Sequence, residues 1–116
     1  LWPRPTSMAL GAELLDAALR LDPAVDALFF CNDDIAQGAL LEALRRGIRV
    51  PEQIAIAGFN DLPGSDQMVP PLTTIRTPRG HIGTEGARML LQLMRGEAVE
   101  PPSVDLGYEL VVRQSS

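Results

Sequence analysis

Hydrophobic runs that end abruptly at the polar pair Asn-Asp occur twice along this chain. Residues 27–31 (ALFFC) precede Asn32 and Asp33, and residues 54–59 (IAIAGF) precede Asn60 and Asp61. Short apolar runs followed by a helical pattern are typical of parallel strands that are buried on both faces. We therefore predict two buried strands of one parallel sheet, over residues 26–31 and 54–59, each followed by an Asn-Asp pair.

Apolar residues at helical spacing predict three helices. Each has a recognisable start or stop signal: residues 8–21 follow the N-cap Ser7, a second helix follows Asp34 and ends at Gly47, and residues 79–95 follow Pro78 and end at Gly96. Small residues line one face of the last helix, which indicates close packing against another segment. The order strand, helix, strand predicts a right-handed β-α-β unit and an α/β fold.

Turn residues and short strands alternate after residue 61. Residues 62–66 predict a loop with one helical turn. Residues 69–76 combine two prolines with a β-branched run, which predicts an edge-type strand or a crossover segment. Residues 108–112 predict a last strand, followed by Arg113 and a polar tail.

Composition limits the classes of function that this chain can have. Its 116 residues are enough for one domain with one core. A net charge of −5 and only 4% aromatic residues disfavour binding of nucleic acid by this part of the protein. All ten basic residues are arginine, which disfavours a Schiff-base enzyme, a Walker-type phosphate loop and a phospho-acceptor receiver domain, because each relies on lysine.

The single cysteine, Cys31, lies within a predicted strand and cannot form an internal disulfide. We expect a buried, reduced thiol and a cytoplasmic protein. No apolar stretch is long enough to span a membrane, and no charged-then-apolar leader opens the chain. Residues 1–5 predict a linker or a broken strand, so we expect the chain to be a fragment of a longer protein.

The two Asn-Asp pairs are the candidate ligand site. Ligands of open parallel sheets bind outside the carboxyl ends of the strands. Each Asn offers a carbonyl acceptor and two amide donors, and each Asp offers two acceptor oxygens, which together suit a polyhydroxylated molecule. Asn32 and Asn60 are the preferred ligand contacts; Asp33 and Asp61 are also included, with capping of the following helix or turn as the alternative role.

Catalysis and metal binding find little support in the sequence. Asp33, Asp34 and Asp61 could hold Mg²⁺, but that ion usually needs substrate phosphates as well, and the chain lacks lysine to handle them. His81 is the only histidine, and Ser65 lacks a nucleophile-elbow pattern and a nearby histidine. We predict no enzyme, no metal and no cofactor.

The second helix has a further face beside its alanine-rich apolar stripe. Gln37, Leu41 and Arg45 share that face, and Met68 lies in the predicted loop nearby. A solvated surface is one interpretation, since single exposed leucines are normal.

The order of these motifs resembles the LacI/GalR family of bacterial transcription regulators. The residues that carry the resemblance are 26–33 (DALFFCND) with Ala36 and Gly38, 47–51 (GIRVP), 58–61 (GFND), 71–75 (PLTTI) and 111–113 (VVR). They follow the family order over nearly the whole chain. The match corresponds to the C-terminal part of the effector-binding core of such a regulator.

This resemblance implies a periplasmic-binding-protein-like fold with an effector between two α/β lobes. The chain would then be an incomplete fragment built on one parallel-sheet, three-layer lobe. Residues 1–74 would belong to the C-terminal lobe, residues 75–106 would cross over and supply a helix of the N-terminal lobe, and residues 107–116 would form the return strand and tail.

The resemblance also implies roles for single residues. Asn32 matches a polar position that faces the effector, and Asn60 stands where the family usually has an aspartate that contacts a ligand hydroxyl. Gln37, Leu41, Arg45 and Met68 match a homodimer interface. The implied function is a ligand-responsive regulator, expected to be a repressor, that binds a sugar or sugar acid. A DNA-binding headpiece outside this chain would bind the operator.

Two other classes remain alternatives from the sequence. A periplasmic sugar-binding protein of a transporter shares the fold and would have a signal peptide upstream. An α/β enzyme could use Asp33 and Asp61 with Mg²⁺.

Overall fold

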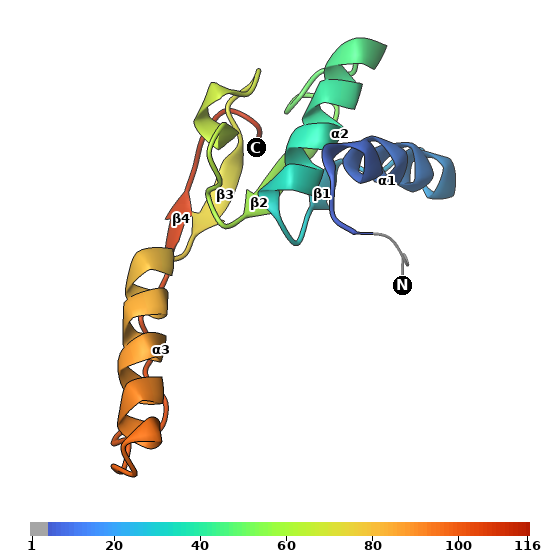
Figure 1. The fold of residues 1–116 in the computed structure, drawn as a ribbon. Coiled ribbons are helices and arrows are strands. Elements are labelled where there is room, and N and C mark those ends of the chain that lie inside the picture. Colours follow the sequence, from blue (N-terminus) through green and yellow to red (C-terminus); the bar gives the residue numbers. More distant parts are fainter. Residues whose placement is uncertain (1–4) are drawn as a thin grey trace. The chain divides into compact units, whose positions relative to one another are not determined.

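The computed structural model describes residues 5–116, in which the chain forms two compact units (Figure 1). The first, here called the sheet unit, contains the chain up to Arg76 together with Leu110–Ser116, and the second, the helical unit, is Thr77–Glu109. The sequence predicted a linker or a broken strand over residues 1–5, and residues 1–4 of this segment lie outside the described range. Both predicted Asn-Asp pairs belong to the sheet unit.

Four strands form one sheet in the order β1-β2-β3-β4. Their bounds are β1 Ala27–Phe29, β2 Ala55–Phe59, β3 Thr73–Arg76 and β4 Glu109–Val111. The pairs β1-β2 and β2-β3 are parallel, which confirms the predicted parallel α/β fold. Of the two alternatives predicted for residues 69–76, an edge-type strand or a crossover segment, the edge-type strand was wrong, because β3 lies between two strands. Pro70 and Pro71 precede β3 and therefore remove no hydrogen bond from its ladder.

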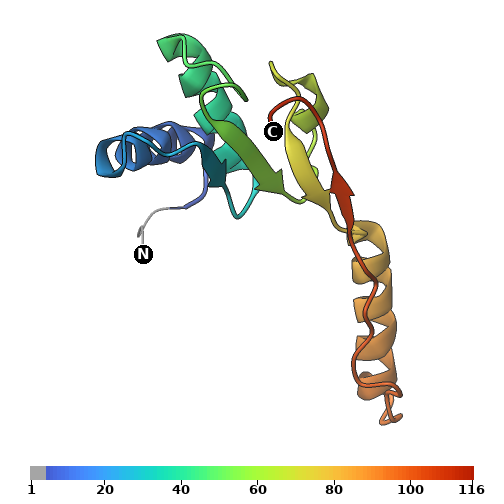
Figure 2. The ribbon, with the colours of Figure 1, turned by 180° about the vertical axis from the view of Figure 1, so that it is seen from behind.

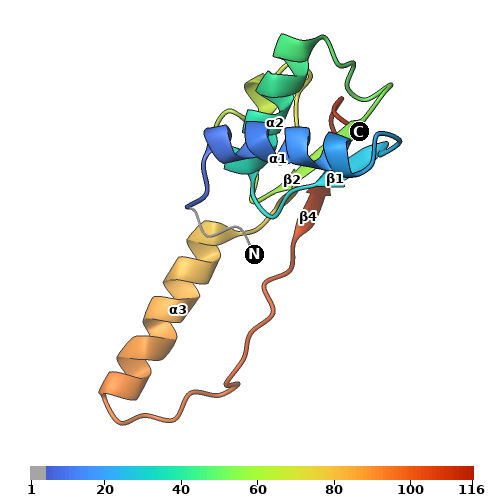
Figure 3. The ribbon, with the colours of Figure 1, turned by 90° about the vertical axis from the view of Figure 1, so that its right-hand side faces the viewer.

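Two helices cover one face of this sheet, α1 (Met8–Leu21) and α2 (Asp33–Arg46). Both begin at side-chain caps: Ser7 Oγ accepts from Leu10 N at 3.1 Å, and Asn32 Oδ1 accepts from Ile35 N at 3.1 Å. α2 ends at Gly47, whose φ of 68° is the left-handed conformation expected of a terminating glycine. Figure 3 shows α1 and α2 crossing one another beside β1 and β2.

The core lies between the helices and the sheet. Its fully buried apolar side chains come from both layers and are Leu15, Ala36, Ala39, Leu40, Ala43, Ile54, Ile56 and Leu72, with 1% exposure or less. Phe30 points into this core as well. Because successive side chains of a strand point to opposite faces, Phe29 and Cys31 are directed away from it.

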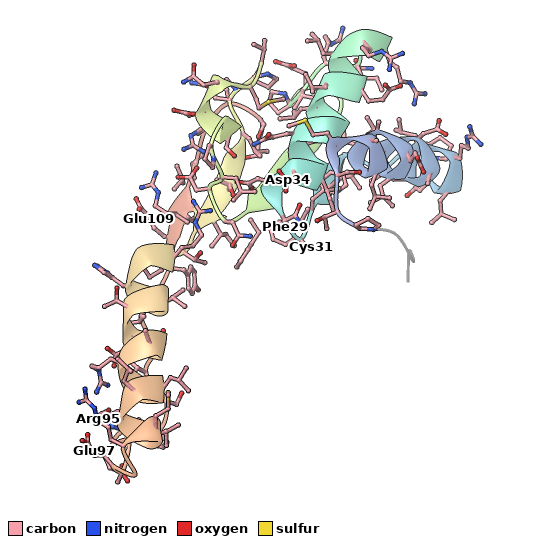
Figure 4. All side chains as sticks on the ribbon, in the orientation of Figure 1. Phe29, Cys31, Asp34, Arg95, Glu97 and Glu109 are labelled. Atoms are coloured by element: carbon pink, nitrogen blue, oxygen red, sulfur yellow. The ribbon has the colours of Figure 1, made fainter. Side chains whose placement is uncertain are left out.

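The opposite face of β1 is therefore open within residues 5–116. Phe29 is 62% exposed and Cys31 is exposed (Figure 4), and Figure 2 shows this side of the sheet unit. The expectation that the first strand is buried on both faces, with Cys31 as a core thiol, was wrong. The hydrophobic run contains more residues than those that face the core, because only every second side chain of the strand points toward the helices.

The end of the chain is part of the sheet unit and not a polar tail. Ser115 has no exposed surface, and it joins β2 to the start of β3. Its carbonyl oxygen accepts from Ile56 N at 2.7 Å, its hydroxyl donates to Ile56 O at 2.5 Å, and the same hydroxyl accepts from Thr73 N at 2.8 Å. A serine hydroxyl that both donates and accepts can satisfy two backbone groups at once.

The helical unit contains α3 (Arg79–Met94), as predicted, and a segment that returns to β4. No residue of α3 is buried, and Leu90, Leu91 and Met94 are all exposed. A Cβ placed on Gly83 or Gly86 would have no neighbour within 4 Å among the described residues. The expected close packing partner of this face is therefore not found within residues 5–116. Figure 4 labels Arg95 and Glu97 just after the end of α3.

No helix in the described part of the chain combines the length and apolar character needed to cross a membrane.

Candidate ligand site at the strand ends

The parallel register brings the predicted site residues to one edge of the sheet. Phe29 pairs with Ala57, so Asn32 and Asn60 each stand three positions beyond this pair. Phe59 pairs with Ile75, which places Arg76 at the same level as Asn60 on the neighbouring strand. The two Asn-Asp sequences therefore follow neighbouring strand ends, as the doubled pattern predicted.

Asn32 is the N-cap of α2 and uses only part of its hydrogen-bonding capacity. Its Oδ1 accepts from Ile35 N, a backbone donor of the first helical turn that has no partner within the helix. Its amide nitrogen has no hydrogen-bond partner within residues 5–116, and the side chain is half-buried. Capping and ligand contact are thus compatible, because they use different atoms of the same side chain.

Asn60 begins a turn with an unusual backbone. Its φ is 105° and that of Asp61 is 49°, and these two are the positive-φ residues other than glycine in the described chain. The backbone of Asn60 is held by its N–H, which donates to Ile75 O at 2.8 Å. Its half-buried side chain makes no hydrogen bond within residues 5–116. Strained, polar positions that the surrounding structure holds in place are concentrated at functional sites.

Asp61 lies between two arginines. Its Oδ2 accepts from Arg76 Nε at 2.7 Å, and its Oδ1 accepts from Arg113 Nη2 at 2.8 Å. Burial opposes ionisation of this carboxyl, but the hydrogen bonds and charges of Arg76 and Arg113 outweigh it and lower the pKa of Asp61. Neither arginine is recognisable from the sequence as a partner of Asp61, because 15 and 52 positions separate them from it.

Asp33 is the first residue of α2 and has no exposed surface. Its Oδ2 accepts from Leu62 N at 2.7 Å and Ser65 Oγ at 2.8 Å, and its Oδ1 accepts from Thr74 Oγ1 at 2.6 Å. Gly58 leaves the room for this carboxylate, since a Cβ there would lie 2.2 Å from Asp33 Oδ1. Asp33 thus joins α2 to β3 and to the loop that follows Asn60 and Asp61.

The acidic residues do not form a metal site in the described chain. No group of three or more histidine, cysteine or acidic side chains there could hold a metal ion. The oxygens of Asp33 are occupied by three donors, and those of Asp61 face two guanidinium groups. Ser65, which the sequence disfavoured as a nucleophile, is buried, and its hydroxyl donates a hydrogen bond to Asp33.

The predicted interface residues separate into two groups. Gln37 is only 3% exposed, and its Nε2 donates to Ser65 Oγ at 3.1 Å. The prediction that Gln37 lies on an outer face of the helix was therefore wrong. A buried amide is tolerated there because the loop supplies its partner. Leu41 and Arg45 are exposed on α2, and Met68 is half-buried against the core.

Comparison with known proteins identifies the family. Residues 2–116 match the family described as periplasmic binding protein-like domain. The chain belongs to this family. The α/β sheet unit agrees with this periplasmic binding protein-like assignment, which also confirms the predicted fold class.

Relatives of this periplasmic binding protein-like chain are transcription regulators. The HTH-type transcriptional regulator GntR of Pseudomonas aeruginosa is 60% identical over 116 residues, which are 100% of this chain and 34% of that protein. The HTH-type transcriptional regulator IdnR of Escherichia coli strain K12 is 45% identical over 105 residues, 90% of this chain and 32% of that protein. The chain therefore spans about one third of the length of these relatives.

Solved structures of regulators have the same fold. The transcription regulator GntR from Chromobacterium violaceum is 54% identical with a TM-score of 0.88, over 98% of this chain and 42% of that chain. A LacI family transcriptional regulator from Silicibacter pomeroyi is 28% identical with a TM-score of 0.82, over 96% and 39%. The transcriptional regulator CelR, in complex with cellobiose, is 33% identical with a TM-score of 0.87, over 95% and 34%. The resemblance to LacI-type regulators is thus confirmed.

Proposed function

We propose that this chain is the effector-binding part of a ligand-responsive bacterial transcription regulator that acts as a repressor in the cytoplasm. The observation that carries the proposal is the Asn60 turn. Asn60, with an unbonded amide side chain on a strained turn, and Asn32 follow two neighbouring strands at the carboxyl edge of a parallel sheet. That edge is where open α/β sheets bind small molecules.

The effector we propose is a sugar or a sugar acid. Carboxamides donate and accept hydrogen bonds, as a ligand rich in hydroxyl groups requires. The two arginines offset the charge of Asp61, and the Asp33 side chain has no exposed surface. Neither carboxylate therefore presents an uncompensated negative charge to the ligand. A carboxylate on the ligand is therefore tolerated here. CelR, with the same fold, binds the sugar cellobiose.

The domain assignment follows from this proposal. Residues 1–74 belong to the C-terminal lobe of an effector-binding core, residues 75–106 cross over and supply a helix of the N-terminal lobe, and residues 107–116 return. The division of the chain into compact units after Arg76 and before Leu110 supports this scheme. An effector that binds one arrangement of the lobes better shifts the population toward it, and so changes the affinity of a DNA-binding headpiece for the operator.

Removal of the two amide groups should weaken effector binding in the gene product that contains this chain. Asn60→Ala removes the whole carboxamide, and Asn32→Ser removes the amide nitrogen while it keeps an oxygen that can cap α2. Each lost hydrogen bond costs about 1–2 kcal/mol, so we expect the dissociation constant to rise by about tenfold in each variant. Calorimetric titration with glucose, cellobiose, gluconate and glucuronate measures it.

Gln67→Ala is the matched control, because it removes an exposed amide from the short 3-10 helix Ser65–Gln67 outside the site. It should leave the affinity unchanged. Unchanged affinity in both site variants would contradict the assignment of Asn32 and Asn60.

We further propose that the exposed end of α2 and the segment after the 3-10 helix form a homodimer interface. Leu41 and Arg45 contribute from α2, together with Leu44, which is 57% exposed; Met68 lies beside Val69, which is 68% exposed. Gln37 is excluded because it is buried within one chain. Exposed apolar side chains, here on each of two segments, are typical of a protein interface when they form one patch.

Leu41→Glu should weaken this dimer, because it places an unpaired charge in an apolar contact. We expect the dimer dissociation constant to rise by at least about 30-fold, measured by sedimentation equilibrium. Leu21→Glu makes the same change at a 90% exposed position at the end of α1 and should have no effect. Equal association of both variants would exclude this surface.

A further inference from the structure

We propose that Asp61 is a positioning residue that links the effector-binding turn to both segments through which the chain enters and leaves the helical unit. The inference rests on the proposed function, and it assigns to Asp61 a role other than ligand contact. The geometry that carries it is one carboxylate bound by two arginines, one at the end of β3 and one on the segment that follows β4.

The two arginines occupy the two ends of the excursion that the chain makes into the helical unit. Arg76 is the last residue of β3 and the last residue of the sheet unit before Thr77. Arg113 follows β4 on the segment by which the chain returns at Leu110. β3 and β4 are neighbours in the sheet, as Figure 2 also shows. Asp61 therefore binds, with its two oxygens, the last residue of β3 and the segment that follows β4.

These ion pairs are shielded from solvent unequally. The side chains of Asp61 and Arg113 are only 12% and 16% exposed, whereas that of Arg76 is 48% exposed. Arg113 is fixed further by Nη1, which donates to Leu72 O at 2.7 Å, and by its backbone N–H, which donates to Thr73 Oγ1 at 2.9 Å. Without the Asp61 charge, the largely buried guanidinium group of Arg113 would lose its carboxylate partner, which is unfavourable for a charge shielded from solvent.

The turn is anchored at its other end to the core. Leu62 N, the next backbone donor after Asp61, is bound by the buried carboxylate of Asp33. Any adjustment of Asn60 on ligand binding is therefore transmitted to Asp61, one peptide bond away, more readily than to Leu62. Coupling of this kind needs a structural element with two arrangements that the ligand stabilises to different extents. The turn that Arg76 and Arg113 bind is such an element.

Hydrogen exchange in the gene product that contains this chain tests the role of Asp61. In the ligand-free protein, Asp61→Asn should raise exchange about tenfold in residues 73–77 and 110–113 and leave α1 and α2 unchanged. Arg76→Gln removes one of the two Asp61 ion pairs and leaves that with Arg113, so it should raise exchange in residues 73–77 alone. Asp66→Asn removes an exposed carboxylate five positions along the chain and should change neither segment.

The coupling itself is tested with the member of the sugar and sugar-acid panel named above that the wild type binds, at saturating concentration. The wild type should show ligand-dependent protection in both strand segments, and Asp61→Asn should lose it in both while ligand still binds. Ligand-dependent protection equal to that of the wild type in Asp61→Asn would overturn the inference. If the wild type binds no member of the panel, the proposed effector class fails and the coupling fails with it, even where the ligand-free exchange pattern confirms the two ion pairs.

Discussion

Gly38→Ala is expected to destabilise the sheet unit by about 3 kcal/mol, near the upper end of the usual cost of overpacking a core. A Cβ at residue 38 would lie 1.9 Å from Met8 O and 2.5 Å from Met8 Cα, both of which are backbone atoms that cannot rotate away. The same crossing has a second glycine, since a Cβ at Gly11 would lie 2.0 Å from Ile35 O. Either substitution forces α1 and α2 apart.

Urea unfolding of the chain measures this effect. Gly11→Ala should cost a similar amount, and the double variant should cost clearly less than the sum, because helices that are already separated accept the second methyl group. Gly83→Ala is the matched control: nothing lies within 4 Å of its Cβ position in the exposed helix α3, so the helix should gain about 1 kcal/mol. A Gly38→Ala variant as stable as the wild type would contradict the close crossing of the helices.

Asp33→Ala is the second substitution for which we expect a large effect, a loss of about 3–4 kcal/mol. It leaves three donors, on Leu62, Ser65 and Thr74, without their acceptor. Hydrogen bonds to a charged group contribute about 1.5–3 kcal/mol each, and rotation of the two hydroxyl groups toward other acceptors recovers part of the loss. Because Asp33 holds the loop after Asn60 and Asp61, ligand affinity should fall along with stability.

The neighbouring acidic residue provides the control for Asp33. Asp34 lies in the same first turn of α2, and its side chain makes no hydrogen bond within residues 5–116, so Asp34→Ala removes only its favourable interaction with the helix N-terminus. We expect a loss of at most about 1 kcal/mol. Thermal unfolding of both variants compares them, and equal losses would show that the buried network around Asp33 does not stabilise the fold.

Local signals in the sequence predicted the elements well. The capping residue Ser7, the terminating Gly47 and the apolar spacing between them place both helices of the sheet unit correctly. The two hydrophobic runs mark β1 and β2, although each strand is shorter than its run. These features depend on neighbours a few positions away, which is why periodicity and caps are enough to recognise them.

Long-range contacts account for the predictions that were wrong. Cys31 was predicted to be buried but is exposed, because its side of the sheet is open within residues 5–116. Gln37 was predicted to be on an outer helix face but is buried, because the loop at Ser65 covers it. From the sequence, Ser115 belongs to a polar tail; in the structure it is hydrogen-bonded to Ile56 and Thr73 of the sheet. Nothing in the neighbouring sequence of these residues indicates the partner.

The two Asn-Asp pairs show the same division at the candidate site. The sequence by itself determined that polar pairs end two neighbouring parallel strands, because a hydrophobic run that stops at a polar residue is a local signal. Only the tertiary structure decided what each residue of a pair does. Within residues 5–116 it leaves the amide nitrogen of Asn32 and the whole side-chain amide of Asn60 without a hydrogen bond. It buries Asp33 under three donors and places Asp61 between Arg76 and Arg113. The role of a polar side chain depends on the partners that folding brings within about 3 Å, and here those partners lie up to 52 positions away along the chain.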